Sequence, residues 1–266
     1  MFDSQQQNDA EHIDQPAYSE DFAIKNLSEQ SNPSDQYYAA WWLGRMRSRH
    51  PQAIPRLLHK LTILNQAEIN IEERGVALNA IRALGKLGAL NAVEPLLELL
   101  QSSDIQIQTE SARSLGELQA NQAIPFLANI LQSIRTKNSC KEVSIELQTA
   151  VIRAIGAIGT SQPTAINTIK NLANDPIPLL RSASCSALVR LTDNPNWITP
   201  IIALLDNSEP LVRRAALLDL GACGRLEGLN AIQAAGVESS LKLIALKMLA
   251  ESTANETIFN AMDELL

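Results

Sequence analysis

Aromatic side chains are scarce in this chain. Its 266 residues include three Trp, three Tyr and four Phe, which together make up 4% of the sequence. The apolar share of 45% is carried mainly by Leu, Ala and Ile. A composition that is poor in aromatics and rich in Leu and Ala favours helices over a sheet-rich fold.

Long hydrophobic runs, a secretion signal and clustered cysteines are also missing. No stretch approaches the roughly 20 apolar residues that span a bilayer, so we expect no membrane association. The first residues are polar and acidic, and we expect segment 1–18 to be flexible. Cys140, Cys185 and Cys223 are too far apart for a CxxC metal motif, and their odd number does not suit a disulfide framework. The sequence therefore predicts a cytoplasmic protein.

Acidic residues are missing from one segment of an otherwise acidic chain. The formal net charge of −7 disfavours nucleic acid as a partner. Between Gln36 and Ala67, however, there is no Asp or Glu. The same segment holds a set of basic residues, namely Arg45, Arg47, Arg49, Arg56 and Lys60. A local positive cluster is therefore expected on an acidic protein.

A helical repeat runs through most of the sequence. Segments such as AAWWLGRM, NAIRALGKLG and AVIRAIGAIG align when one position is kept in register, occupied in turn by Gly44, Gly85, Gly116, Gly156, Val189 and Gly221. The spacings of 41, 31, 40, 33 and 32 residues are typical of α-solenoids. Apolar residues one, four and five positions before the glycine form a stripe, and the glycine allows close helix crossing.

Prolines support the same register. Nine to eleven residues after the repeated position, a proline opens an apolar run at Pro55, Pro95, Pro125 and Pro200. Proline is tolerated in the first turn of a helix. The sequence therefore predicts an all-α fold, a right-handed α-solenoid of HEAT-like helix-turn-helix repeats, with about six pairs plus caps. It is expected to form a single domain over residues 19–266, with a terminal cap near residues 241–252.

Four of the ten aromatic residues lie in the stretch YYAAWWL. In the first repeat, Ala39, Ala40, Leu43 and Met46 take the stripe positions. The rings of Tyr37, Tyr38, Trp41 and Trp42 are therefore surplus to the repeat core. Tyr38, Trp41, Trp42 and Arg45 follow one another in steps that place them on one helix face. Such a face suits a flat conjugated ligand or a partner protein, but Tyr18, Phe22 and Leu27 could instead fold back and cover the rings as ordinary core.

No catalytic or metal motif accompanies these rings. There is no phosphate-binding loop, GxSxG or HExxH sequence, and His12, His50 and His59 lack metal-ligand spacing, so no metal site is expected. Asp35 is a candidate proton donor because it lies within one turn of Tyr38. Its alternative role is that of helix N-cap. The motifs alone indicate a binding scaffold.

The string YYAAWWLG, followed by RMR and by glycine-marked repeats, resembles the E subunit of the cyanobacterial E/F-type phycobilin lyases. The string is specific to that family, whereas the repeats are shared with many HEAT-like proteins. Within the family the chain is most like the subunits that act on the phycocyanin α subunit.

The resemblance implies an enzyme that works as a heterodimer with an F-type subunit. Such an enzyme attaches phycocyanobilin, an open-chain tetrapyrrole that is its substrate rather than a tightly bound cofactor, through a thioether to a cysteine of the phycocyanin α subunit. The nucleophile then belongs to the acceptor. Stacking on pyrrole rings would fall to Tyr37, Tyr38, Trp41 and Trp42, and binding of the two propionates to Arg45, Arg47 or Arg49.

Three alternatives stay open at this point. A phycoerythrocyanin-type lyase subunit shares the YYAAWWL string. A non-catalytic HEAT-repeat scaffold would use the rings as an interface. A bilin-detaching protein of phycobilisome turnover would have the same fold without attachment activity.

Overall fold

The protein is an arc of helices. The computed structural model describes residues 18–28, 30–66, 68–136, 141–160 and 162–266. Every regular element in these ranges is a helix, which confirms the predicted fold class. Within the same ranges no helix is both long and apolar enough to cross a bilayer.

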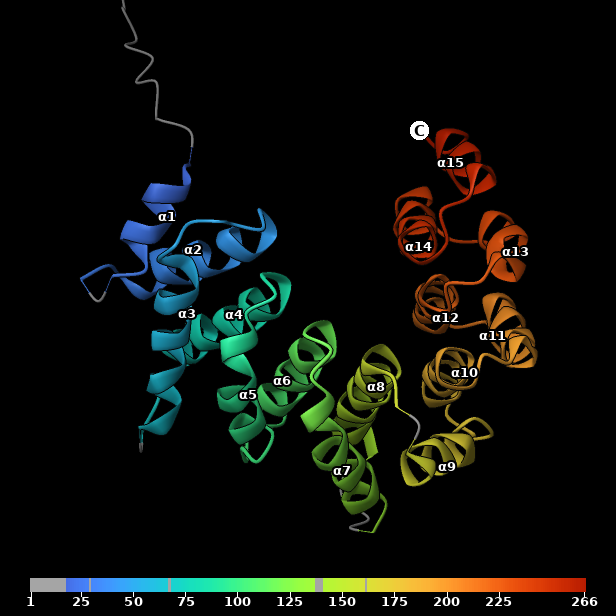
Figure 1. The fold of residues 1–266 in the computed structure, drawn as a ribbon, viewed down its shortest axis with the longest axis horizontal. Coiled ribbons are helices and arrows are strands. Elements are labelled where there is room, and N and C mark those ends of the chain that lie inside the picture. Colours follow the sequence, from blue (N-terminus) through green and yellow to red (C-terminus); the bar gives the residue numbers. More distant parts are fainter. Residues whose placement is uncertain (1–17, 29, 67, 137–140, 161) are drawn as a thin grey trace, which may run out of the picture.

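Two layers of helices follow the arc (Figure 1). The inner, concave layer consists of α2 (Pro33–Arg45), α4 (Ile71–Lys86), α6 (Ile105–Glu117), α8 (Lys141–Ile158), α10 (Pro178–Thr192), α12 (Pro210–Ala222) and α14 (Ser239–Ser252). The outer layer consists of α3 (Ala53–Leu61), α5 (Val93–Leu99), α7 (Ile124–Thr136), α9 (Pro163–Leu172), α11 (Ile198–Ala203), α13 (Leu229–Ala234) and α15 (Glu256–Asp263). The short helix α1 (Glu20–Asn26) precedes the first pair.

Short 3-10 turns connect the layers. They are η1 (Thr62–Asn65), η2 (Leu90–Ala92), η3 (Asn121–Ala123), η4 (Pro195–Trp197), η5 (Leu204–Asp206) and η6 (Leu226–Gly228). The prolines predicted to open the second helix of a unit do so, since Pro55, Pro95, Pro125 and Pro200 all lie in the first turn of an outer helix.

The described residues form seven pairs, one more than the sequence predicted. The expected cap at 241–252 is in fact the inner helix α14, and α15 pairs with it. This seventh unit was not predicted as a pair because α14 carries Ala250, and not glycine, at the repeat position. The segment 1–17 lies outside the described residues. Tyr18, which we had placed in the flexible segment, packs against the rings of α2.

The core lies between the two layers. In α4 the predicted stripe residues Ala80, Ile81 and Leu84 are fully buried. In α2 the same positions are held by buried Ala39, Ala40 and Leu43, but Met46 is 59% exposed, so its predicted place in the core is wrong. Met46 is the C-cap of α2, where the chain leaves the helix and the stripe ends.

The repeated glycines bring neighbouring inner helices together. A Cβ built on Gly44 would lie 2.8 Å from the Ala83 Cα atom of α4. A Cβ on Gly116 would lie 2.9 Å from the Ala154 Cα atom. Only glycine fits at these crossings, so the inner helices pack closely against one another. The residues on the concave face consequently occupy equivalent positions on successive helices.

Candidate functional site

The helix that carries the rings begins with a well-made N-cap. The Asn32 side chain accepts a hydrogen bond from the Asp35 backbone N–H at 2.9 Å and donates one to the Asp35 carboxylate at 2.7 Å. The N-cap is therefore Asn32, and the alternative interpretation of Asp35 as N-cap is wrong. Asp35 lies in the first turn with an exposed side chain.

Three of the four rings of α2 reach the surface. Tyr37, Tyr38 and Trp41 are 47%, 44% and 43% exposed, whereas Trp42 is partly buried against the core. The Tyr38 and Trp41 ring centroids lie 5.3 Å apart with their planes tilted by 33°. These two rings form an aromatic surface that is open to a flat molecule.

The segment before α2 covers part of this surface. The Tyr18 ring meets Tyr38 edge-on at 4.8 Å and Trp42 at 5.5 Å. Burial raises the pKa of the Tyr18 hydroxyl, which accepts a hydrogen bond from the Asn26 amide. The alternative in which the leading segment seals all the rings is thus correct for Trp42 only in part and does not hold for Trp41.

Tyr37 lies against the next inner helix. Its ring is next to Gly75, where an added Cβ would lie 3.3 Å from the Tyr37 Cδ2 atom. The Asn79 amide of α4 donates a hydrogen bond to the Tyr37 carbonyl oxygen at 3.1 Å. The ring helix is therefore fixed to its neighbour.

The predicted arginines separate into two groups. Arg45 is the last residue of α2 and follows Trp41 by one helical turn, so it shares the ring face. Arg47 and Arg49 lie beyond the Met46 C-cap in the loop toward α3, and the fold does not bring them onto that face. All three are exposed, and among the described residues their guanidinium groups have no hydrogen-bond or ion-pair partner.

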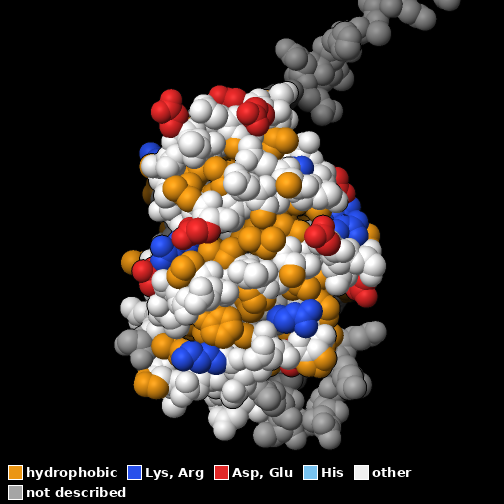
Figure 2. All heavy atoms as spheres, turned by 90° about the vertical axis from the view of Figure 1, so that its right-hand side faces the viewer, with side chains coloured by type: hydrophobic (Ala, Val, Ile, Leu, Met, Phe, Trp, Pro, Cys, Tyr) orange, Lys and Arg blue, Asp and Glu red, His pale blue; other side chains and the backbone are white. Residues whose placement is uncertain are grey.

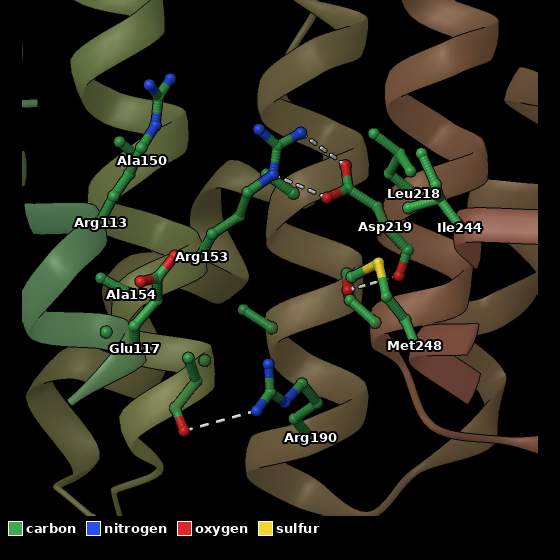
Figure 3. Close-up of a pocket in the computed structure, with 17 residues that line it drawn as sticks. Arg113, Glu117, Ala150, Arg153, Ala154, Arg190, Leu218, Asp219, Ile244 and Met248 are labelled. Carbon is green, nitrogen blue, oxygen red and sulfur yellow. Dashed lines mark hydrogen bonds and ion pairs between the residues drawn. The ribbon is translucent and has the colours of Figure 1, made fainter. Parts of the chain in front are cut away.

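The concave layer also holds a groove of about 530 Å³. It runs across α6, α8, α10, α12 and α14 (Figure 3). Its floor is made of small side chains, including Ala150, Ala154, Ala157, Ala183 and Ala187. Ile244 and Met248 of α14 close one end. A volume of this size lies in the range of pockets that hold small organic ligands.

Charged residues stand along the groove walls. The Arg153 guanidinium donates two hydrogen bonds to the Asp219 carboxylate, from Nε at 2.7 Å and from the Nη2 atom at 3.0 Å. Ser182 donates a third at 2.7 Å to the same, almost fully buried carboxylate. Arg190 donates to the Ala157 carbonyl oxygen at 3.4 Å. The groove is apolar below and carries both arginines and carboxyl groups along its sides, which suits a flat ligand with polar substituents.

Glu117 is the carboxyl group of this wall that lacks a hydrogen-bond partner among the described residues. Desolvation raises its pKa, and the positive charges of Lys86 and Arg47 partly oppose the rise. A Cβ on Gly85 would lie 2.7 Å from its Oε2 atom, so the carboxylate rests over the end of α4. Glu117 is thus a candidate proton donor beside the groove.

This groove was not predicted from the sequence. Its residues belong to the same register as the rings, since Arg113 and Arg153 occupy the position of Trp41, and Ala154 that of Trp42. The sequence pattern that could have indicated the groove is a small residue directly after an arginine on successive inner helices, as in Arg113–Ser114 and Arg153–Ala154. What the sequence could not supply was the contact between Arg153 and Asp219, which are 66 positions apart.

Comparison with known proteins decides the family. Models of HEAT repeats match residues 64–137 and 138–221, and a model of the PBS lyase HEAT-like repeat matches residues 35–62. The chain is 46% identical to a bilin biosynthesis protein, RpcE, of Synechococcus sp. (strain WH8020), over 98% of this chain and 100% of that protein. It is 36% identical to the phycocyanobilin lyase subunit alpha of Picosynechococcus sp. (strain ATCC 27264 / PCC 7002 / PR-6), over 88% of each. The chain belongs to the phycocyanobilin lyase alpha-subunit family.

A solved structure agrees with this membership. The complex of CpcE and CpcF of phycocyanin lyase from Nostoc sp. PCC7120 contains a chain that is 33% identical, with a TM-score of 0.80, covering 99% of this chain and 100% of that one. The resemblance read from YYAAWWL and the repeats is thereby confirmed.

The cysteines of this lyase subunit are unsuited to nucleophilic chemistry in the described ranges. Cys185 is fully buried, and burial raises its pKa to about 11. Cys223 is 6% exposed, and burial raises its pKa to about 12. Cys140 lies outside the described residues. No grouping of three or more potential metal ligands occurs in the same ranges.

Proposed function

We propose that this chain is the E-type subunit of a heterodimeric lyase that, with an F-type subunit, joins phycocyanobilin to a cysteine of the phycocyanin α subunit. The observation that carries the proposal is its similarity over nearly the full length to the CpcE–CpcF complex of phycocyanin lyase, together with an open aromatic surface on α2. As the sequence predicted, we place the enzyme in the cytoplasm.

The acceptor supplies the reacting sulfur. Its thiolate adds to the ethylidene group on ring A of the bilin, so that a carbon–sulfur bond forms while the carbon–carbon π bond breaks. The neighbouring ring carbon takes up a proton. This chain needs no thiol for that step, which is consistent with the buried Cys185 and Cys223.

The contribution of this chain is orientation. Tyr38 and Trp41 provide stacking surfaces, and Arg45 at the end of the same face can bind a propionate through charge-assisted hydrogen bonds. Tyr37 and Trp42 hold the ring helix against its neighbours. The groove over α6 to α14 extends the concave surface on which a long, flat molecule can lie. If the chain holds one conformer of the bilin with ring A exposed, the acceptor thiolate meets ring A in a fixed orientation and not by random collision.

Two carboxyl groups are candidates for the proton transfer. Asp35 lies in the first turn of the ring helix, and Glu117 lies beside the groove with a raised pKa. We favour Glu117, because a carboxyl group with a raised pKa retains its proton closer to neutral pH.

The test is a titration of phycocyanobilin with the purified heterodimer, followed by visible absorbance. Trp41→Ala removes one exposed stacking surface, and we expect binding to weaken roughly two- to tenfold. The matched control is Phe259→Ala in α15, which removes a ring that is 51% exposed at the other end of the arc. It should leave the titration unchanged.

Two results would contradict the assignment of the rings. An unchanged titration for Trp41→Ala combined with loss of co-purification with the F-type subunit would make the ring face a subunit interface. Absence of any absorbance change with the wild-type heterodimer would remove the bilin hypothesis altogether. Co-expression with the acceptor and a bilin source should yield an acid-stable chromophore, and replacing the acceptor cysteine should abolish it.

A further inference from the structure

A cluster of exposed basic residues lies where α2 and α4 end. Arg47 and Arg49 follow α2, and Lys86 is the last residue of α4. Two exposed apolar residues are close to them in sequence: Met46 directly precedes Arg47, and Leu90 follows Lys86 by four residues, and the two are 59% and 73% exposed. We call these five residues the basic rim. Because α2 and α4 are packed neighbours, their ends form one edge of the concave face (Figure 1).

The rim differs from most of the other described arginines in the pairing of its charges. Six arginines elsewhere form ion pairs with Asp or Glu, namely Arg74, Arg82, Arg113, Arg153, Arg214 and Arg225. In the described part of the chain, the side chains of Arg47, Arg49 and Lys86 have no hydrogen-bond or ion-pair partner. Figure 2 shows that on the side of the C-terminal arm the basic and acidic side chains are instead scattered and intermixed.

The acids nearest to the rim do not neutralise it. Glu117 interacts electrostatically with Arg47 and Lys86 without a hydrogen bond to either. The Glu20 carboxylate is occupied by the loop backbone, and Asp21 lies 3.5 Å from the His50 ring. The rim therefore keeps unpaired positive charge within a chain of net charge −7.

Arg47 also stands in a conformation that disfavours it. Its φ of 51° lies in the left-handed region, where the corresponding positions after α4, α8 and α12 carry Gly88, Gly159 and Gly224, but those after α6 and α10 carry Gln119 and Asp193. A residue with a Cβ is strained there. A positive charge near a helix C-terminus is favourable, but that effect does not require this position and does not extend to Arg49. Arg47 therefore carries a modest cost in stability, as Gln119 and Asp193 do at the equivalent positions.

The loop that carries the rim is held rigidly. The Glu20 carboxylate accepts hydrogen bonds from the backbone N–H groups of Arg49 at 2.9 Å and His50 at 3.2 Å, and from the Ser48 hydroxyl. The Ser48 N–H donates to the Leu43 carbonyl oxygen at 3.0 Å. The two arginines are consequently presented from a fixed backbone, which lowers the entropic cost of binding a partner.

We infer that the basic rim docks an acidic surface of the acceptor protein and so directs its cysteine toward the ring face. The inference rests on the proposed function. Arg45, the last residue of α2, follows Trp41 by four residues, or about 6 Å of helix rise, and Arg47 lies two residues beyond it. A protein seated on the rim therefore reaches the edge of a bilin on the rings. The exposed Met46 and Leu90 suit a protein surface, and the net charge of −7 disfavours a polyanion such as nucleic acid.

The test uses the heterodimer with the apo-acceptor and phycocyanobilin. The initial rate of covalent attachment is measured against acceptor concentration at low and high salt. For Arg47→Glu/Arg49→Glu we expect KM for the acceptor to rise roughly tenfold at low salt. The salt dependence should also reverse, because like charges now face each other and added salt screens their repulsion. Arg47→Lys/Arg49→Lys keeps the charge and should stay close to wild type.

A matched control and a second readout keep the inference falsifiable. Lys170→Glu/Lys247→Glu makes the same charge change at exposed sites on α9 and α14, and an equal rise in KM there would overturn the inference. Loss of bilin binding by Arg47→Glu/Arg49→Glu without acceptor would return both residues to the propionate role predicted from the sequence. Loss of the F-type subunit would make the rim a subunit interface. Failure of wild type to attach any bilin would refute the proposed function instead.

Discussion

The crossing of α2 and α4 provides a sharp test of how the solenoid is held together. A Cβ added at Gly44 would lie 2.8 Å from the Ala83 Cα atom and 2.9 Å from its Cβ atom. Carbon atoms prefer separations of about 3.5–4.0 Å, so Gly44→Ala forces the two helices apart by about 1 Å. Overpacking of this kind costs about 1–3 kcal/mol, which the better helix propensity of alanine offsets by about 1 kcal/mol. We expect a net loss of about 1 kcal/mol.

The control is the same substitution on the neighbouring helix. A Cβ at Gly75 in α4 would meet only the edge of the Tyr37 ring, at 3.3 Å, and a side chain can give way where backbone cannot. Gly75→Ala should therefore gain up to about 1 kcal/mol. Urea denaturation followed by circular dichroism should separate the two variants by about 2 kcal/mol. If Gly44→Ala proves as stable as Gly75→Ala, the glycine does not serve the close crossing.

Three further predictions concern single groups. The hydrogen bond from Arg74 lowers the pKa of the Asp104 carboxyl group. The pair therefore stabilises the fold at pH values above the ordinary carboxyl pKa of about 3.9, and this contribution is lost as the pH falls through the lowered pKa. In Asp104→Asn, the free energy of unfolding should fall less steeply as the pH is lowered. Arg47→Gly should raise stability by about 0.5–1 kcal/mol in thermal unfolding, whereas Arg47→Ala, which keeps a Cβ, should not. Cys185 and Cys223 should resist iodoacetamide in the native protein and react in urea, as mass spectrometry of the alkylated peptides would show; rapid native labelling would contradict their burial.

Much of the architecture could be predicted because it repeats. The glycine register gives the inner helices, and the prolines give the starts of the outer ones. Features that occur only once could not be predicted from the repeat pattern. The seventh pair has alanine where the others carry glycine or valine. Cys223 is buried beside α10, where its Sγ atom lies 3.6 Å from the Ser186 Oγ atom.

The candidate site was predictable only in part, for the same reason. Steps of three and four along α2 are enough to group Tyr38, Trp41 and Arg45. The separation of Arg47 and Arg49 from them depends on where the helix stops, and the chain leaves the helix at Met46. The cover provided by Tyr18 depends on a segment with no repeat to guide its placement. The N-cap lies at Asn32, three residues before Asp35, so α2 begins earlier than the sequence indicated.

The contact from Arg153 to Asp219 has a consequence for how the arc unfolds. In most solenoids each unit touches only the next one, so the ends fray one repeat at a time. Here a side chain of α8 reaches across α10 to α12, and Ser182 of α10 binds the same carboxylate. Three successive inner helices are thereby tied at one point, so the C-terminal half should open as a block and the groove should keep its shape until that block is lost.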